Sequence, residues 1–259
     1  MDTITSYKEY IVKSIPQIQQ YEQESFCWRT DGKGQEYAIL KEMKEKHKDF
    51  AVALDHLDER LSRDSVSRCY KDDYYTGVIA TLMWGGYHKI LYTRRQLDAV
   101  LSTGKGDIEK SIAKVDKMLS ENRFQDAFLA LESGDCHIKG IGTSYLTKIL
   151  YFLSKGKSLP EQPLIFDNVQ RWTHAALLID DNAINAKEYY KPTSQGGLRG
   201  LKNDADLYVD YIQRINMIGK THDLTPDRLE AYLFGTPTRS KKDTENPRLL
   251  TREFVKRHL

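Results

Sequence analysis

The segment 138–144 constrains the fold of this chain more than any other stretch. It reads Ile-Lys-Gly-Ile-Gly-Thr-Ser and lies between two regions with helical spacing of apolar residues, about 123–133 and 143–155. Gly140 and Gly142 permit a tight turn that other residues would resist. The second glycine directly precedes a helix, whose first N–H groups and positive dipole end attract phosphate. The segment therefore predicts a helical hairpin able to hold a nucleic-acid backbone.

Helical patterns dominate the remainder, and alternating strand patterns are scarce. The sequence therefore predicts an all-α protein. Gly104 and Gly106 interrupt the chain, and Asp107 is predicted to cap the helix that follows. The long polar loop that ends at Gly200 is expected to border the functional site of the protein. The charged tail 239–259 is expected either to pack as a helix or to stay mobile. The predicted helices cover about 37–48, 51–61, 74–91, 108–131, 143–155, 168–178, 204–218 and 226–234.

Length and charge bound the organisation. A chain of 259 residues can form two lobes, and we expect an N-terminal helical region at 1–105, a core at 106–185 and completing helices at 186–259. The net charge is only +2, so nucleic-acid binding requires a local basic surface. Candidate basic clusters include Lys139, Lys148, Lys155, Lys157, Arg199, Lys202 and the tail 239–257.

Cysteine usage and hydropathy argue for a reduced, cytoplasmic protein without a membrane segment. Cys27, Cys69 and Cys136 lack the paired spacing of a disulfide framework or of a zinc or iron–sulfur site. The polar N-terminus lacks the apolar core of a signal peptide, and no run approaches the roughly 18 apolar residues of a membrane span.

Asp167 is the candidate for chemistry. It follows the apolar run Leu164-Ile165-Phe166 and precedes a predicted helix. A carboxylate there can stabilise a positively charged sugar and deprotonate a water molecule. The structural alternative is an N-cap that accepts hydrogen bonds from the first amides of the helix. One aspartate can serve in both ways.

The hairpin and the Asp167 context together resemble the helix-hairpin-helix (HhH-GPD) superfamily of DNA glycosylases. The resemblance is nearest to bacterial proteins of the 8-oxoguanine glycosylase fold, some of which act against phage. It implies two helical lobes around a DNA-binding cleft, base flipping and excision from double-stranded DNA, and a monomer associated with the bacterial nucleoid. By the same resemblance, Asp167 is the catalytic residue, and the DNA-binding residues are Lys139, Gly140, Gly142, Thr143, Ser144 and Asn168.

The resemblance is incomplete at one position. Relatives that also cleave the DNA strand carry a lysine two residues after the second glycine, where this chain has Ser144. This departure resembles the monofunctional adenine-excising branch and implies direct hydrolysis assisted by Asp167. Lys148 lies one helical turn further on and keeps a bifunctional glycosylase and abasic-site lyase open as an alternative.

The resemblance also implies a cation at the hairpin. Relatives often bind Na⁺ or K⁺ through main-chain carbonyls, which here belong to Cys136, Ile138 and Ile141. We expect that no other cofactor is required. A competing interpretation is a non-enzymatic hairpin that clamps duplex DNA, which needs the glycines but not Asp167.

The base pocket is the least constrained part of the site. Trp84, Tyr87 and His88 surround the pair Gly85-Gly86 and are candidate pocket residues, because backbone can approach a ligand closely at glycine. The alternative places these aromatics in the core, with the glycines permitting close helix packing. Sequence alone leaves the excised base open between a damaged purine such as 8-oxoguanine, mispaired adenine and a modified phage base.

Overall fold

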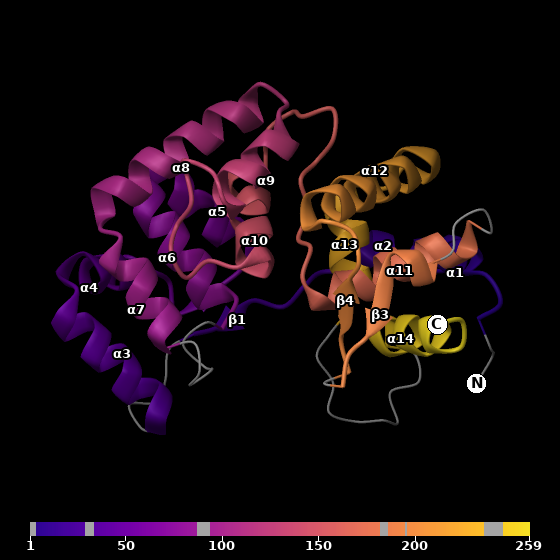
Figure 1. Ribbon diagram of the computed structural model, residues 1–259, viewed down its shortest axis with the longest axis horizontal. Coiled ribbons are helices and arrows are strands. Elements are labelled where there is room, and N and C mark those ends of the chain that lie inside the picture. Colours follow the sequence, from indigo (N-terminus) through magenta and orange to yellow (C-terminus); the bar gives the residue numbers. More distant parts are fainter. Residues whose placement is uncertain (1–3, 29–33, 87–93, 182–185, 195, 236–245) are drawn as a thin grey trace. The chain divides into compact units, whose positions relative to one another are not determined.

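The structure is a computed structural model that describes residues 4–28, 34–86, 94–181, 186–194, 196–235 and 246–259 (Figure 1). It is predominantly helical, which confirms the all-α prediction. The chain forms two compact units, residues 24–163 and residues 1–23 with 164–259. In the described part, no helix combines the length and hydropathy needed to cross a bilayer.

The unit 24–163 is built around α6 (Tyr74–Trp84). Nine of the eleven residues of α6 are buried, so this helix is apolar on all sides and forms the core of the unit. It is packed against α4, α5, α8 and α10. The other elements are β1 (Phe26–Cys27), α3 (Gly34–Lys46), α4 (Lys48–Asp55), β2 (Arg60–Leu61), α5 (Arg63–Asp72), α7 (Arg94–Ser102), α8 (Lys105–Ser120), α9 (Phe124–Glu132) and α10 (Thr143–Ser154). Strands β1 and β2 pair antiparallel.

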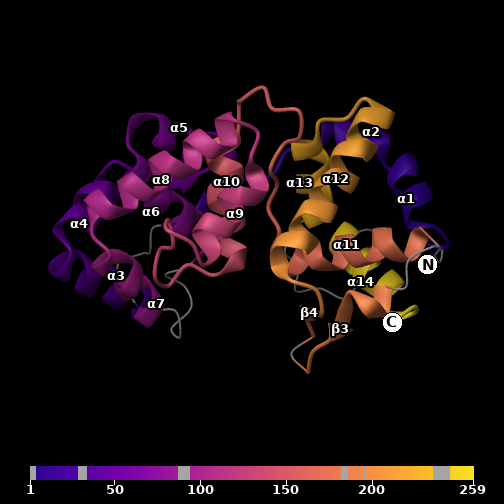
Figure 2. The ribbon, with the colours of Figure 1, turned by 45° about the horizontal axis from the view of Figure 1, so that its top comes forward.

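The second unit is centred on α11 (Asn168–Asp180), which packs against α1, α13, α14 and β4. Trp172, Ala175 and Leu178 give α11 a buried apolar face. The remaining elements are α1 (Tyr7–Lys13), α2 (Ile15–Gln20), the 3₁₀ turn η3 (Ala186–Glu188), β3 (Tyr190–Pro192), β4 (Leu198–Gly200), α12 (Asp204–His222), α13 (Pro226–Phe234) and α14 (Pro247–Lys256). In both ribbon views β3 and β4 lie beside α11 (Figures 1 and 2).

Several sequence-based boundaries differ from the structure. The predicted helical range 108–131 contains two helices, α8 and α9, because Asn122 adopts a left-handed φ of 59° between them. Helix α9 agrees with the range 123–133 predicted for the first helix of the hairpin. The prediction that Asp107 caps α8 is wrong. Gly104, with φ of 86°, is the cap, and Asp107 lies in the first turn. The predicted helix 51–61 corresponds to α4, which ends at Asp55.

The compact units divide the chain at Gln23/Glu24 and Pro163/Leu164, whereas the predicted segments change at 105/106 and 185/186. The hairpin segment and Asp167 consequently belong to different units, although both fall in the segment 106–185. Of the two alternatives for the tail, the described part packs as helix α14, with Phe254 and Val255 buried.

A buried polar network fixes β3 to the helices. His174 of α11 is fully buried, and its Nδ1 lies 2.7 Å from the Tyr190 hydroxyl of β3. Its Nε2 lies 2.6 Å from Oδ2 of Asp210 in α12. Arg214 also donates to Asp210. Burial lowers the pKa of His174. A neutral imidazole that donates a hydrogen bond to Asp210 through Nε2 can accept a hydrogen bond from the Tyr190 hydroxyl at Nδ1.

This network predicts a pH-dependent stability. The pKa of His174 is lower in the folded protein than its usual value of about 6.5. The neutral side chain therefore contributes its full stabilisation above about pH 6.5, and this stabilisation is lost as the pH falls through the pKa of the folded protein. The loss is at most about 1.4 kcal/mol per pH unit for one proton. Urea unfolding between pH 8 and pH 5 measures it. His174→Gln should be less stable at pH 8 and should lose less stability on acidification, whereas parallel curves for the two proteins would contradict the assignment.

Candidate functional site

The predicted hairpin is present between α9 and α10. Ile138 and Ile141 are buried and anchor the turn, and the Ile141 N–H donates to the Ile138 carbonyl at 3.1 Å. Lys139 and Gly142 are exposed at its tip. The hairpin thus combines an apolar attachment with a solvent-facing backbone segment that carries one lysine, as expected for contact with a polyanion.

The two glycines serve different purposes. Gly140 has φ of 91°, and a Cβ atom there would lie 2.4 Å from the carbonyl oxygen of Gln96 in α7. Gly142 has an ordinary φ of −99° and is the N-cap of α10 without a side-chain hydrogen bond. A Cβ atom at Gly142 would meet nothing within 4 Å. Gly140 is therefore required by the fold, whereas Gly142 leaves space for a ligand at a helix N-terminus.

Lys148 and Ser144 form a local pair in the first two turns of α10. Only 5% of Lys148 is exposed, and its Nζ donates to the Ser144 carbonyl at 3.2 Å and to the Ser144 hydroxyl at 3.0 Å. The same ammonium lies 5.2 Å from the centre of the Tyr145 ring. The Lys148 amine is thus placed next to the residue that occupies the position of the family's lysine.

Asp167 is the N-cap of α11, so the structural alternative considered for it is realised. Its Oδ1 accepts the N–H groups of Val169 at 2.8 Å and Gln170 at 3.3 Å. Both bonds end on one carboxylate oxygen, and the residue is half-buried after a fully buried apolar run. Gln170 is in turn held by Glu230 of α13, whose carboxylate accepts from Nε2 at 2.8 Å. The carboxylate of Asp167 is therefore fixed in position at the positive end of a helix.

Asn168, a predicted DNA-binding residue, makes an internal contact. Its Oδ1 accepts the Leu198 N–H at 3.3 Å, and its amide group occupies the space that a Cβ atom of Gly197 would need. Asn168 therefore ties the β3–β4 hairpin to the first turn of α11. This contact depends on residues 30 positions apart, so no local sequence pattern indicated it.

Arg248 of α14 was not singled out from the sequence. Burial lowers the pKa of its guanidinium, while the negative charge of Asp167 acts in the opposite direction. Its Nε donates to the Phe234 carbonyl at 3.1 Å, and its charge lies 4.6 Å from the centre of the Phe234 ring. Arg248 thus places a positive charge in the electrostatic environment of Asp167. The basic character of the tail was the only sequence signal for it.

The predicted cation ligands at the hairpin are main-chain carbonyls, of which that of Ile138 accepts the Ile141 N–H at 3.1 Å. The side chains of Cys136, Ile138 and Ile141 are buried, so any ion bound to these residues would contact their carbonyls. Burial raises the pKa of the Cys136 thiol to about 11, so this side chain stays protonated at neutral pH. Within the described ranges, His, Cys, Asp and Glu side chains form no cluster that could hold a metal.

Trp84 lies in the core of its unit. It is 8% exposed and packs edge-to-face on Phe152 with 5.2 Å between ring centres. The adjacent Gly85 accommodates Tyr145, whose hydroxyl donates to the Gly85 carbonyl at 2.7 Å. These contacts favour the core interpretation of this segment over a base pocket. Tyr87 and His88 lie outside the described residues.

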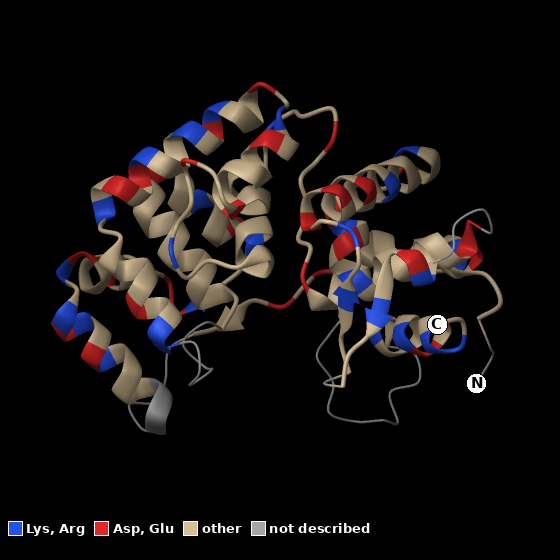
Figure 3. Ribbon diagram, viewed as in Figure 1, with Lys and Arg blue, Asp and Glu red and all other residues tan. Residues whose placement is uncertain are grey.

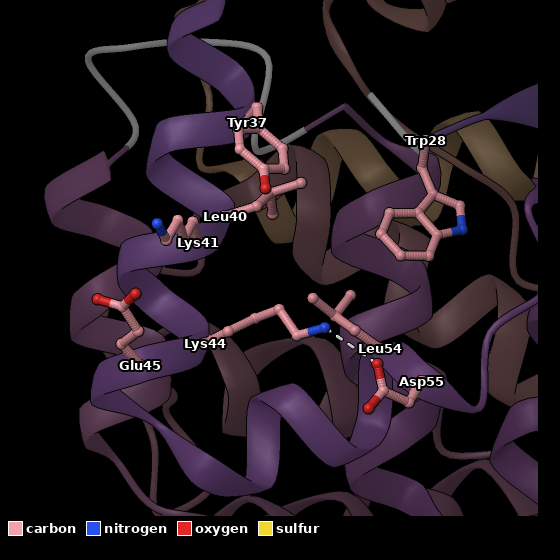
Figure 4. A pocket seen from close by; sticks show the side chains of 8 residues that line it. All are labelled: Trp28, Tyr37, Leu40, Lys41, Lys44, Glu45, Leu54 and Asp55. Atoms are coloured by element: carbon pink, nitrogen blue, oxygen red, sulfur yellow. Dashed lines mark hydrogen bonds and ion pairs between the residues drawn. The ribbon is translucent and has the colours of Figure 1, made fainter. Parts of the chain in front are cut away.

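An aromatic hollow of about 520 Å³ lies elsewhere in the unit 24–163 (Figure 4). Trp28 and Tyr37 form part of its wall, and the Trp28 ring is held by a 2.6 Å hydrogen bond from its indole N–H to the Asp58 carbonyl. Lys44 and Asp55 pair at 3.0 Å on one side. The lining combines aromatic and apolar side chains with charged ones, and its two aromatic rings are groups that a planar ring can stack against.

A comparison with protein families shows which family the chain belongs to. The family model described as "Putative 8-oxoguanine DNA glycosylase OGG-like protein" matches residues 20–234. This range contains the hairpin between α9 and α10 and also Asp167. No curated protein and no solved structure matches the chain.

The two glycines of the hairpin should respond differently to alanine. Gly140→Ala should destabilise the protein by at least about 2 kcal/mol, because it combines a positive φ with a clash against Gln96. Gly142→Ala should change stability by no more than about 1 kcal/mol but should weaken duplex DNA binding. Urea unfolding and a DNA-binding titration distinguish the two effects. Equal loss of stability in both variants would contradict this division.

Proposed function

Because the chain belongs to the OGG-like family, we propose that it is a DNA glycosylase that excises a damaged or modified base from double-stranded DNA by hydrolysis. The observation that carries the proposal is the position of Asp167. Its carboxylate is fixed at the N-terminus of α11 within the range that the family model matches. A fixed anionic group of this kind suits a reaction that develops positive charge on the sugar.

The proposed reaction adds water across the glycosidic bond. As the bond between C1′ and the base nitrogen breaks, its electron pair leaves with the base and positive charge develops on the deoxyribose. Asp167 stabilises this charge and accepts a proton from the attacking water, whose oxygen bonds to C1′. The departing base takes up a proton, and the products are the free base and an abasic site. The capping bonds from Val169 and Gln170 orient the carboxylate for this role.

The hairpin is proposed to bind the DNA backbone. Lys139 and the exposed N-terminus of α10, with Gly142, Thr143 and Ser144, supply a positive charge and main-chain donors for phosphate. The carbonyls of Cys136, Ile138 and Ile141 are the proposed ligands of a Na⁺ or K⁺ ion, which would add positive charge to the hairpin.

The substrate is proposed to be 8-oxoguanine or a modified base in phage DNA, the second of which would give the protein a role in antiviral defence. The family description supports the first of these. The substrate can be identified with a panel of duplexes that carry 8-oxoguanine, mispaired adenine or modified phage bases. Mass spectrometry of the released bases shows which of them the protein excises.

Asp167→Asn is the sharpest test of the proposed chemistry. Asparagine caps helices as well as aspartate does, so the variant should retain its stability and its DNA binding. It should lose base release by at least about a hundredfold, because the negative charge is gone. Asp167→Ala is the matched control for the cap and should cost about 1 kcal/mol of stability in addition. Undiminished release by the Asn variant would refute the role of Asp167.

A non-enzymatic DNA clamp is the competing function. It predicts duplex binding by the wild type with no base released from any substrate in the panel, and equal binding by Asp167→Asn.

Ser144 supports the monofunctional form of the proposal, and the buried contact of Lys148 with Ser144 keeps a lyase testable. Borohydride added during reaction should trap no covalent protein–DNA complex, since hydrolysis forms no Schiff base. A trapped complex that disappears in Lys148→Gln would instead assign Lys148 as the nucleophile of a bifunctional enzyme. The retained stability of Lys148→Gln must be checked by urea unfolding, because the side chain is buried.

A further inference from the structure

The β3–β4 hairpin places two like charges directly opposite each other. Lys191 of β3 pairs with Arg199 of β4, flanked by the pairs Tyr190–Gly200 and Pro192–Leu198. Lys191 and Arg199 are exposed, while Tyr190 and Leu198 are buried toward the helices. Basic residues are visible on both strands (Figure 3). Like charges at directly opposed positions destabilise a strand pair, so this arrangement works against the hairpin's own stability.

Two arginines of the same unit are paired with carboxylates. Arg171 donates to Asp204 at 2.8 Å, and Arg214 donates to Asp210 at 2.7 Å. Among the residues that the structure describes, neither Lys191 nor Arg199 takes part in an ion pair. The two charges therefore face solvent without a carboxylate partner from the described part of the chain.

The hairpin is fixed to the helix that carries Asp167. Asn168, the residue after Asp167, accepts the Leu198 N–H, and its side chain packs on Gly197. On the other strand, the Tyr190 hydroxyl is bound to the buried His174. Both strands are thus attached to α11, one of them at its first residue. A ligand bound by Lys191 and Arg199 would be held on an element that is tied directly to the Asp167 cap.

We propose that Lys191 and Arg199 bind the phosphodiester backbone of duplex DNA and hold a strand on the unit that carries Asp167. The inference rests on the proposed function and extends it to residues outside the helical hairpin. A bound polyanion attracts both charges and offsets the repulsion between them, so the opposed pair is better accommodated with DNA than without it. The net charge of only +2 makes such local pairs important for DNA affinity.

The test compares Lys191→Gln/Arg199→Gln with Lys13→Gln/Lys220→Gln, which removes two exposed charges of the same unit, on α1 and α12, that lie outside the hairpin and outside the predicted basic clusters. Binding of a short unmodified duplex is measured by fluorescence anisotropy between about 50 and 200 mM salt. Loss of two phosphate contacts should make the negative slope of log K against log salt shallower by about 1.8 in the hairpin variant. The control should keep the wild-type slope. An unchanged slope in the hairpin variant, or an equal decrease in both variants, would overturn the proposal.

Lys191→Glu guards against a folding artefact. It places opposite charges on the two strands, so hairpin stability should be retained or increased while DNA affinity falls below that of the wild type. Wild-type affinity of this variant would overturn the proposal.

The measurement uses unmodified DNA and needs no excision, so it is independent of the glycosylase reaction. If the wild type releases no base but the slope changes as expected, the proposed function fails and the DNA contact stands. If base release depends on Asp167 but the slope does not change, the proposed function stands and the proposed DNA contact fails.

Discussion

The first turn of α11 is the constraint on which most of the second unit depends. Asp167 accepts hydrogen bonds from the first amides of the helix. Asn168 accepts a hydrogen bond from β4, and Gln170 donates one to the buried Glu230 of α13. One turn later His174 holds β3 and α12. Because Asn168, Gln170 and His174 have partners on other elements, the helix start cannot move without breaking hydrogen bonds that are partly or fully buried. This rigidity is what a positioned carboxylate requires.

In the helical hairpin of the other unit, one glycine is required by the fold and the other leaves space for a ligand. A side chain at Gly140 would clash with the α7 backbone, and Gly140 has a conformation that only glycine adopts readily, whereas a Cβ atom at Gly142 would meet no neighbour. The buried side chains of Ile138 and Ile141 hold the turn in place. Lys139 and the N-cap Gly142 of α10 remain exposed, and these are the groups proposed to bind phosphate without reading sequence.

The basic residues follow a similar division. Arg171 and Arg214 form partly buried pairs that stabilise the helices, and Arg248 lies in the electrostatic environment of Asp167. Lys191 and Arg199 are instead left opposite each other on an exposed hairpin. Charges with internal partners serve the fold, whereas charges that the fold leaves opposed are available for an anionic ligand. A nearly neutral chain can concentrate positive potential in this way.

Most of the helices and two parts of the site could be predicted from the sequence because they depend on local patterns. The periodicity of apolar residues predicted α10, α11 and α13 closely, and the glycine spacing predicted the hairpin. Asp167 could be selected because its place between an apolar run and a helix, together with the hairpin, resembles the glycosylase motif; the same place also predicted the N-cap that it forms. The cap of α8 was misassigned because a glycine with positive φ competes with aspartate for the end of a helix.

The tertiary structure decided everything that depends on distant residues. Asn168 is hydrogen-bonded to Leu198, and Trp84 packs on Phe152. Burial lowers the pKa of Arg248, and the negative charge of Asp167 acts in the opposite direction. The sequence by itself determined the helical class, the hairpin and the candidate carboxylate, since each depends on neighbours within one or two turns. The surroundings of that carboxylate and the opposed basic pair were decided only by folding, because the residues that meet there are 30 or more positions apart or lie in register across a hairpin.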